Sequence, residues 1–364
     1  MNSKRDSPHF YINGRFLTQQ MTGVERYAWN MCKAMAALGQ DFTIVCPHAK
    51  ILDCYDTHGM NVIKYGFGNS HFWEQCVFPL FFLLKRHFIV FSFTGLGSIL
   101  VRNKVMTIHD LSFLEDPAWF SRSYYYWYKL MTPLAVRSSR HIITVSEFSK
   151  REILRFYPFL KESNITVAYN AVDEEQFHHL HHQFKPSEHF ALTVSSLDPR
   201  KNFLRLAQAF EGIEGLSLHI VGNANRVFGK QKGMKSLPKN VRLLGRVSDW
   251  DLLQLFHQAD CFIFPSIYEG FGLPPIEAMR CGCPVLASDI PVLHEVCGDA
   301  ADYFNPLDVE DIRKTIQTFI DNMEEKKPVM RERGYKNINR FSWQNSAQIL
   351  IKLANDLSRK PNII

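Results

Sequence analysis

Two carboxylates, Glu269 and Glu277, stand with seven residues between them in the segment Ser-Ile-Tyr-Glu-Gly-Phe-Gly-Leu-Pro-Pro-Ile-Glu-Ala-Met (266–279). Gly270 and Gly272 favour a tight loop, and the prolines that follow suit the first turn of a helix. The pattern predicts one carboxylate on a loop, backbone N–H groups at a helix N-terminus, and a second carboxylate in the first helical turn. Such a set can bind a diphosphate and hydroxyl-bearing groups together, as a sugar nucleotide requires. In the alternative interpretation, Glu269 is a solvated loop residue and Glu277 only favours the helix dipole.

A basic pair, Arg200 and Lys201, lies in Asp-Pro-Arg-Lys-Asn (198–202), between an apolar run and a helical pattern. Open parallel sheets bind ligands beyond the carboxyl ends of their strands. Arginine offers a planar fork to phosphate oxygens and lysine a point charge, so the pair can neutralise a diphosphate. The alternative is two solvated cations, which would oppose the dipole at a helix start unless an anion binds there.

A histidine, His109, follows the apolar run 105–108 and begins His-Asp-Leu. At the end of a strand it can hydrogen-bond a sugar or assist proton movement. Its neighbour Asp110 either shares that role or caps the next segment. Near the N-terminus, Gly23 opens a helix. Glu25 or Arg26 beside it are candidates for recognising a second substrate, the acceptor of a transferred group.

Short apolar runs alternate with amphipathic helical patterns through both halves of the chain. This alternation predicts an α/β fold with two Rossmann-like, doubly wound parallel sheets. No Gly-x-Gly-x-x-Gly follows any of the runs, which disfavours a nicotinamide-linked oxidoreductase. The expected strands lie near 10–12, 42–46, 88–91, 105–108, 141–145, 191–197, 216–221, 241–244, 261–265, 284–287 and 301–304; the expected helices include 23–38, 147–156, 251–258, 308–323 and an amphipathic C-terminal segment, 341–357.

Composition limits the function classes. The 364 residues, 46% hydrophobic and 21% charged, suit two globular domains, and no apolar run is long enough to span a bilayer. The N-terminus lacks the apolar stretch of a signal peptide, so we expect a cytoplasmic protein. The net charge of +6 is not gathered into a block typical of nucleic-acid binding. Cys281 and Cys283 have no second pair at zinc spacing and are expected to be buried thiols.

Four other segments allow more than one interpretation. The polar stretch 173–188 carries four clustered histidines, which can bind a metal ion. No cysteine or convergent set of carboxylates accompanies them, which favours a solvated linker helix over a metal site. The apolar run 77–84, followed by Lys-Arg-His, and the aromatic, basic segment 121–140 suit either core helices or contact with a membrane surface. Asp249-Trp250-Asp251 is interpreted as a helix start, not as a metal site.

Glu-Gly-Phe-Gly-Leu-Pro (269–274) and Glu-Ala-Met (277–279) resemble the signature of the retaining glycosyltransferases of family 4, which have the two-domain GT-B fold with an interdomain cleft. The resemblance implies an acceptor-binding domain, residues 1–170 completed by a helix near 342–364, and a donor-binding domain, residues 171–341. Arg200 and Lys201 match the family's pyrophosphate-binding loop. By the same resemblance Glu277 would accept hydrogen bonds from the ribose, and Glu269 and His109 would hold the donor sugar. The remaining implied donor contacts are the backbone of Gly270, Phe271, Gly272 and Leu273, and Gly23 at the diphosphate.

The implied activity is transfer of a hexose from a nucleotide-diphosphate sugar to a hydroxyl of a glycan or lipid-linked glycan, in the synthesis of a surface polysaccharide. No metal ion or other cofactor is expected, because side-chain cations would stabilise the leaving diphosphate. Association with the inner face of the membrane is part of this hypothesis. The rival interpretations are a nucleotide-sugar epimerase of the same architecture and a degenerate scaffold that binds a sugar nucleotide without turnover.

Overall fold

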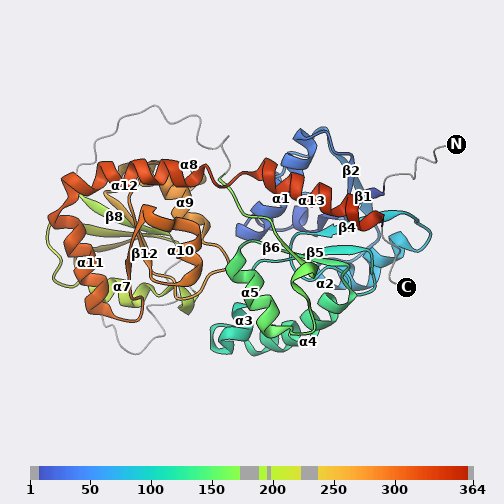
Figure 1. Ribbon diagram of the computed structural model, residues 1–364, viewed down its shortest axis with the longest axis horizontal. Coiled ribbons are helices and arrows are strands. Elements are labelled where there is room, and N and C mark those ends of the chain that lie inside the picture. Colours follow the sequence, from blue (N-terminus) through green and yellow to red (C-terminus); the bar gives the residue numbers. More distant parts are fainter. Residues whose placement is uncertain (1–7, 173–187, 195–197, 223–236, 360–364) are drawn as a thin grey trace. The chain divides into compact units, whose positions relative to one another are not determined.

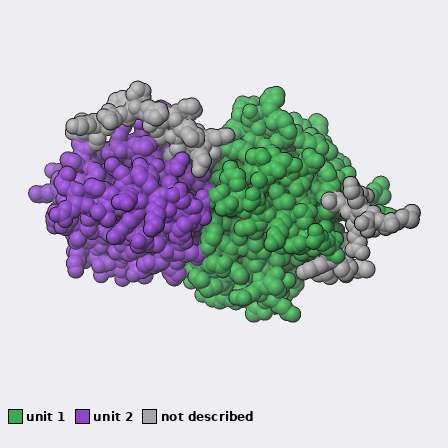
Figure 2. Space-filling view, turned by 45° about the horizontal axis from the view of Figure 1, so that its top comes forward, with its two compact units in different colours: residues 1–170, 342–364 green, residues 171–341 purple. Residues whose placement is uncertain are grey.

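The computed structural model describes residues 8–172, 188–194, 198–222 and 237–359, so the histidine cluster of the polar stretch lies outside the described residues (Figure 1). The chain divides into two compact units (Figure 2). Unit 1 comprises residues 1–170 and 342–364, and unit 2 comprises residues 171–341. Among the described residues, no helix combines the length and the apolar character needed to cross a bilayer.

Unit 1 is built on a parallel sheet of seven strands in the order β3-β2-β1-β4-β5-β6-β7. The strands β1, β2, β4, β5 and β6 coincide with expected apolar runs, whereas β3 and β7 were not expected. Every residue of β2 and β5 is buried, as continuous apolar strands in a covered parallel sheet should be. The strands are β1 (His9–Asn13), β2 (Phe42–Pro47), β3 (Asn61–Tyr65), β4 (Phe88–Ser92), β5 (Lys104–Ile108), β6 (His141–Thr144) and β7 (Ile165–Val167).

Unit 2 contains a second parallel sheet, of six strands in the order β10-β9-β8-β11-β12-β13. This is the order of a doubly wound nucleotide-binding sheet, so the predicted fold class is confirmed. The strands are β8 (Phe190–Val194), β9 (Ser217–Val221), β10 (Val241–Gly245), β11 (Cys261–Phe264), β12 (Val285–Ser288) and β13 (Ala301–Phe304).

Helices complete each unit. In unit 1 they are α1 (Gly23–Ala37), α2 (Ser70–Phe72), α3 (Ser112–Glu115), α4 (Arg122–Ser138), α5 (Glu147–Phe156) and α13 (Trp343–Ser358). In unit 2 they are α7 (Phe203–Ala209), α8 (Asp249–Gln258), α9 (Leu273–Arg280), α10 (Pro291–Cys297), α11 (Val309–Asp321) and α12 (Met323–Ile338). Short turns are η1 (Gly14–Thr18), η2 (Trp73–Val77), η3 (Phe78–Phe82), η4 (Pro117–Trp119), η5 (Glu162–Asn164), η6 (Pro199–Lys201) and η7 (Gly298–Ala300).

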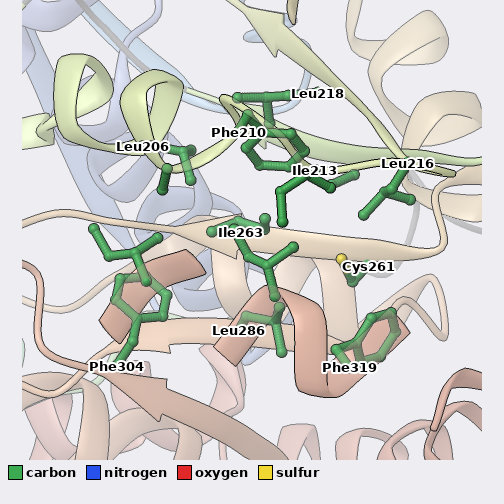
Figure 3. Packing of buried hydrophobic residues seen from close by; sticks show 14 of the residues in the cluster. Leu206, Phe210, Ile213, Leu216, Leu218, Cys261, Ile263, Leu286, Phe304 and Phe319 are labelled. Carbon is green, nitrogen blue, oxygen red and sulfur yellow. The ribbon is translucent and has the colours of Figure 1, made fainter. Parts of the chain in front are cut away.

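The apolar faces of α7 and α11 pack on one face of the unit 2 sheet (Figure 3). Phe210, Ile263 and Leu286 are each less than 2% exposed in this cluster. Burial of an apolar side chain stabilises a fold by about 1.5–3 kcal/mol, so this cluster stabilises the packing of these helices on the sheet of unit 2.

The C-terminal helix α13 belongs to unit 1. The Trp343 ring lies edge-on to Tyr27 of α1 at 5.6 Å, and Ser346 donates to the carbonyl of Tyr169 at 2.8 Å. Two expected helix boundaries are wrong. Helix α8 begins at Asp249 instead of residue 251 because Ser248 caps it, and the expected helix 308–323 ends at Asp321, before α12.

Each sheet has one place where the strand order reverses, between β1 and β4 in unit 1 and between β8 and β11 in unit 2. At such a switch point the connections after the two strands run to opposite sides, which opens a crevice at their carboxyl ends. The residues that follow these four strands are therefore where a ligand site is expected.

Candidate functional site

The turn η6 follows β8, and the Glu269 loop follows β11, so both lie at the switch point of unit 2. Two hydrogen bonds join them. The N–H of Ile267 donates to the carbonyl of Arg200 at 2.8 Å, and Nη1 of Arg200 donates to the carbonyl of Tyr268 at 3.2 Å. The basic pair and the loop carboxylate are thus held side by side by backbone as well as by charge.

A four-residue ion-pair group, the Glu269 cluster, consists of Asp198, Arg200, Lys201 and Glu269. Oε1 of Glu269 accepts from Nζ of Lys201, and its Oε2 lies 3.5 Å from Nη1 of Arg200. Nε of Arg200 donates to Asp198 at 2.7 Å. Glu269 is only 7% exposed, and a carboxylate so far from water requires such partners. The cluster holds two negative and two positive side chains.

The sequence around η6 explains its shape. Asp198 caps the turn by accepting from the N–H of Arg200 at 3.1 Å, and Pro199 supplies the fixed φ that suits the first position. The turn ends at Asn202, which adopts the left-handed conformation with φ 58°.

The helix α9 begins directly after Gly272, whose φ is 93°. A Cβ at Gly272 would lie 2.8 Å from Cδ2 of Leu293, so only glycine fits this turn without movement. Phe271 is anchored edge-on to Phe341 at 5.4 Å, and Leu273 is the first residue of the helix. Gly270, between Glu269 and Phe271, is buried.

The expected position of Glu277 in the first turn of that helix is wrong. Because Gly272 takes the capping position, Leu273 and the two prolines fill the first turn and Glu277 is the fifth residue. Glu277 is half-buried and adds its charge to the burial that raises the pKa of the Cys281 thiol. Cys281 and Cys283 are both buried free thiols, as expected.

In unit 1, His109 follows β5 and lies at the switch-point side of the sheet. Its Nε2 lies 2.8 Å from the carbonyl of Phe93, just after β4, and its ring is edge-on to Tyr27 at 4.8 Å. Burial lowers the pKa of His109, although the Phe93 carbonyl and the charges of Asp110 and Glu25 partly oppose the shift. A carbonyl only accepts, so a neutral His109 carries its proton on Nε2 and offers Nδ1 as an acceptor.

The acidic residues near Gly23 and His109 hold local turns. Glu25 accepts from the N–H of Thr22 at 3.2 Å and from its hydroxyl, which closes the first turn of α1. Asp110 accepts from the N–H of Ser112 at 3.0 Å and from its hydroxyl at 2.6 Å, ahead of α3, whose capping residue is Leu111. No atom lies within 4 Å of a Cβ built on Gly23, so packing within the described structure does not require a glycine there.

A buried acidic group that no sequence pattern predicted lies at the switch point of unit 1. Glu74, on η2, accepts from Asn13 at 2.7 Å and lies 3.5 Å from Nε of Arg15. Nη2 of Arg15 reaches the carbonyl of Thr94 at 3.3 Å. Burial opposes the ionisation of Glu74, but Arg15, His71 and Asn13 together outweigh it and lower its pKa.

The structure therefore brings Arg200, Lys201 and Glu269 together, with Gly270 to Leu273 and Glu277 following on the same loop and helix. His109 and Gly23 lie in unit 1. Asp249 and Asp251 open α8, as interpreted from the sequence. Within the described ranges, no three His, Cys, Asp or Glu side chains are grouped as metal ligands.

Two family models match the chain. The model "Glycosyl transferases group 1" matches residues 174–337, and "Glycosyltransferase Family 4" matches residues 21–176. Among curated proteins, O-antigen chain mannosyltransferase RfbU of Salmonella typhimurium is 32% identical over 69% of this chain and 69% of its own. O-antigen chain mannosyltransferase B of Escherichia coli is 28% identical over 66% and 67%.

Solved structures share the fold. Sucrose-phosphate synthase from Thermosynechococcus elongatus has a TM-score of 0.71 at 17% identity and covers 97% of this chain and 99% of its own. Anabaena HepE in complex with UDP-glucose has a TM-score of 0.71 at 18% identity, covering 95% and 99%.

The lowered pKa of His109 predicts a pH dependence of stability. At pH values between the ordinary value of 6.5 and the lower folded value, the unfolded chain binds a proton that folded His109 does not. Stability should therefore be complete above pH 6.5 and fall below it, by at most about 1.4 kcal/mol per pH unit. The urea midpoint of His109→Gln should fall less between pH 6.5 and 5 than that of the wild type. His48→Gln, at an exposed position, controls for the loss of a histidine; parallel curves for wild type and His109→Gln would contradict the assignment.

Proposed function

The chain belongs to glycosyltransferase family 4, and on that premise we propose that it transfers mannose from a nucleoside-diphosphate mannose to a glycan acceptor in surface polysaccharide synthesis. The glycosyltransferase activity follows from the family. The choice of mannose and of a surface glycan is supported by the relatives, which are mannosyltransferases of O-antigen chains. The observation that carries the site assignment is the Glu269 cluster at the switch point of unit 2.

The cluster suits a diphosphate because of its charge balance. Arg200 and Lys201 are neutralised by Asp198 and Glu269 in the structure, and all four side chains are at most 17% exposed. An entering diphosphate competes with the two carboxylates for the two cations. Once Lys201 turns to the diphosphate, Glu269 is released to accept hydrogen bonds from sugar hydroxyls.

The same exchange supplies the chemistry. As the bond from the sugar to the diphosphate breaks, negative charge grows on the leaving oxygen, and fixed cations stabilise that charge most where water is scarce. Glu269 would orient the sugar by accepting from its hydroxyls, and Glu277 would accept from the ribose. In unit 1, Nδ1 of His109 would accept from a substrate hydroxyl. We propose that the reaction retains the anomeric configuration and needs no metal ion.

We also propose that the enzyme works at a membrane surface, through the α4 apolar surface: Phe67, Phe72, Tyr126, Trp127, Leu130 and Leu134. Tyr126, Leu130 and Leu134 recur every four residues along α4 and are 65%, 63% and 42% exposed. The ring of His71, next to Phe72, lies 5.5 Å from the ring of Trp127 at a tilt of 47°. Phe72 in turn contacts Phe67, so this contact links the helix to the two phenylalanines.

The charge of α4 favours an anionic lipid surface. The helix carries exposed Arg122, Lys129 and Arg137 and no acidic residue. Basic residues beside exposed aromatic and aliphatic side chains are typical of interfacial helices. A second exposed apolar group with adjacent basic residues, Leu83 and Leu84 before Lys85 and Arg86, follows η3. In the run 77–84, Val77, Phe78 and Phe82 are buried instead, so only part of it is available to lipid.

The transferase proposal predicts opposite effects on binding and turnover for Glu269→Gln. Without the competing charge, the cations meet a diphosphate more readily, so the affinity for GDP or UDP should rise severalfold. Turnover should fall by about 100-fold or more because the amide has no charge and keeps only one of the two oxygens that accept from the sugar. Lys201→Ala should weaken both. Calorimetry measures affinity, and transfer of labelled mannose from GDP-mannose or UDP-mannose to a lipid-tailed mannosyl acceptor, with EDTA present, measures turnover.

Lys314→Ala, an exposed lysine on α11, is the matched control and should behave as wild type. Weaker nucleotide binding by Glu269→Gln would contradict the exchange of partners. Conversion of the sugar nucleotide to its epimer without an acceptor would favour the epimerase, and binding without any turnover would favour the scaffold. Loss of turnover in EDTA would refute metal independence.

The membrane proposal predicts that wild-type protein co-sediments with vesicles of phosphatidylcholine and phosphatidylglycerol better than with phosphatidylcholine alone. Leu130→Glu should reduce the bound fraction severalfold, because it places a negative charge at the lipid surface. Leu307→Glu is the control, since Leu307 is 62% exposed but lies in unit 2. Equal binding by the two variants would refute the role of the α4 apolar surface.

A further inference from the structure

Asn202 joins η6 to α7 in a backbone conformation that few residues tolerate. Its φ of 58° and ψ of 30° lie in the left-handed region. Within the described residues, three non-glycine residues have positive φ, namely Ser70, His87 and Asn202, and only Asn202 is buried. Asparagine tolerates this region better than most residues with a side chain, whereas most others pay about 1–2 kcal/mol.

The side chain of Asn202 is fixed on both sides. Its Nδ2 donates to the carbonyl of Pro306, after β13, at 2.6 Å, and its Oδ1 accepts from Arg205 at 2.9 Å. Its N–H closes η6 on the carbonyl of Pro199 at 3.1 Å, and its carbonyl accepts from Leu206 at 3.3 Å to begin α7. Asn202 therefore ends one helical turn and starts another.

The left-handed conformation of Asn202 separates η6 from α7, so that Arg200 and Lys201 are not part of the helix. If residue 202 were right-handed, η6 would run on into α7, and the two cations would follow the helical spiral away from the Glu269 loop. We propose that Asn202 is a positioning residue of the donor site, which sets the direction from which Arg200 and Lys201 meet the diphosphate. The inference rests on the proposed function of the Glu269 cluster.

Two variants separate the backbone from the side chain. Asn202→Gly keeps the left-handed turn at no steric cost and loses the hydrogen bonds, so its affinity for GDP or UDP should stay within about threefold of wild type. Asn202→Ala loses the hydrogen bonds and also disfavours the left-handed turn. It should weaken the affinity for GDP or UDP about tenfold and lower kcat/KM to the same extent. The glycine variant also preserves a folded protein for comparison if the alanine variant is unstable.

A double-mutant cycle with Lys201→Ala distinguishes positioning from stability. If Asn202 acts through the cations, its tenfold effect on affinity should shrink to threefold or less once Lys201 is absent, whereas its effect on the thermal midpoint should persist. An equal loss of affinity in both backgrounds, or a lowered midpoint with unchanged affinity, would overturn the inference. Unchanged affinity in Lys201→Ala alone would instead refute the proposed function of the cluster.

Discussion

The pairing of Glu269 with two cations is the constraint on which the switch point of unit 2 depends. Glu269 is separated by 68 and 69 residues from Lys201 and Arg200, yet it is nearly buried with them. An unpaired carboxylate there would cost several kcal/mol, so the cluster forms only when β8 and β11 are neighbours. The strand order that makes β8 and β11 neighbours and the opposite charges of the side chains that follow these strands therefore depend on each other.

The two switch points use charge differently. In unit 1, Glu74 is wholly buried against Arg15 and Asn13, and Arg15 is itself 6% exposed. With Glu74 wholly buried and Arg15 nearly so, this pair holds η2 to the end of β1. In unit 2, the Lys201 and Arg200 side chains keep 14% and 16% of their surface exposed. Only the second arrangement combines low solvation with access, which is what a site for an anionic leaving group needs.

Much of this organisation could be predicted from local pattern, and the failures have identifiable causes. Apolar runs located the central strands because parallel strands covered on both faces are continuously hydrophobic. The strand Asn61–Tyr65 was missed because it lies at the edge of its sheet and is largely exposed. Helix α12 was missed because half of its residues are charged and it contains Pro328. The roles of Glu74 and Asn202 depend on partners distant in the sequence, Arg15 and Pro306, which no local pattern identifies.

The start of α9, where the predicted position of Glu277 was wrong, offers few backbone donors to a ligand. A helix N-terminus leaves four N–H groups unpaired, and these are the usual source of its attraction for anions. In α9 the second and third positions are prolines, which have no N–H, so two of the four donors are missing and backbone donation centres on Gly272 and Leu273. Glu277, in the second turn, is negatively charged and therefore does not attract an anion. In the proposed site, the charge of a diphosphate would therefore be met chiefly by Arg200 and Lys201, so the geometry of η6 would matter more to binding than the helix that follows Glu269.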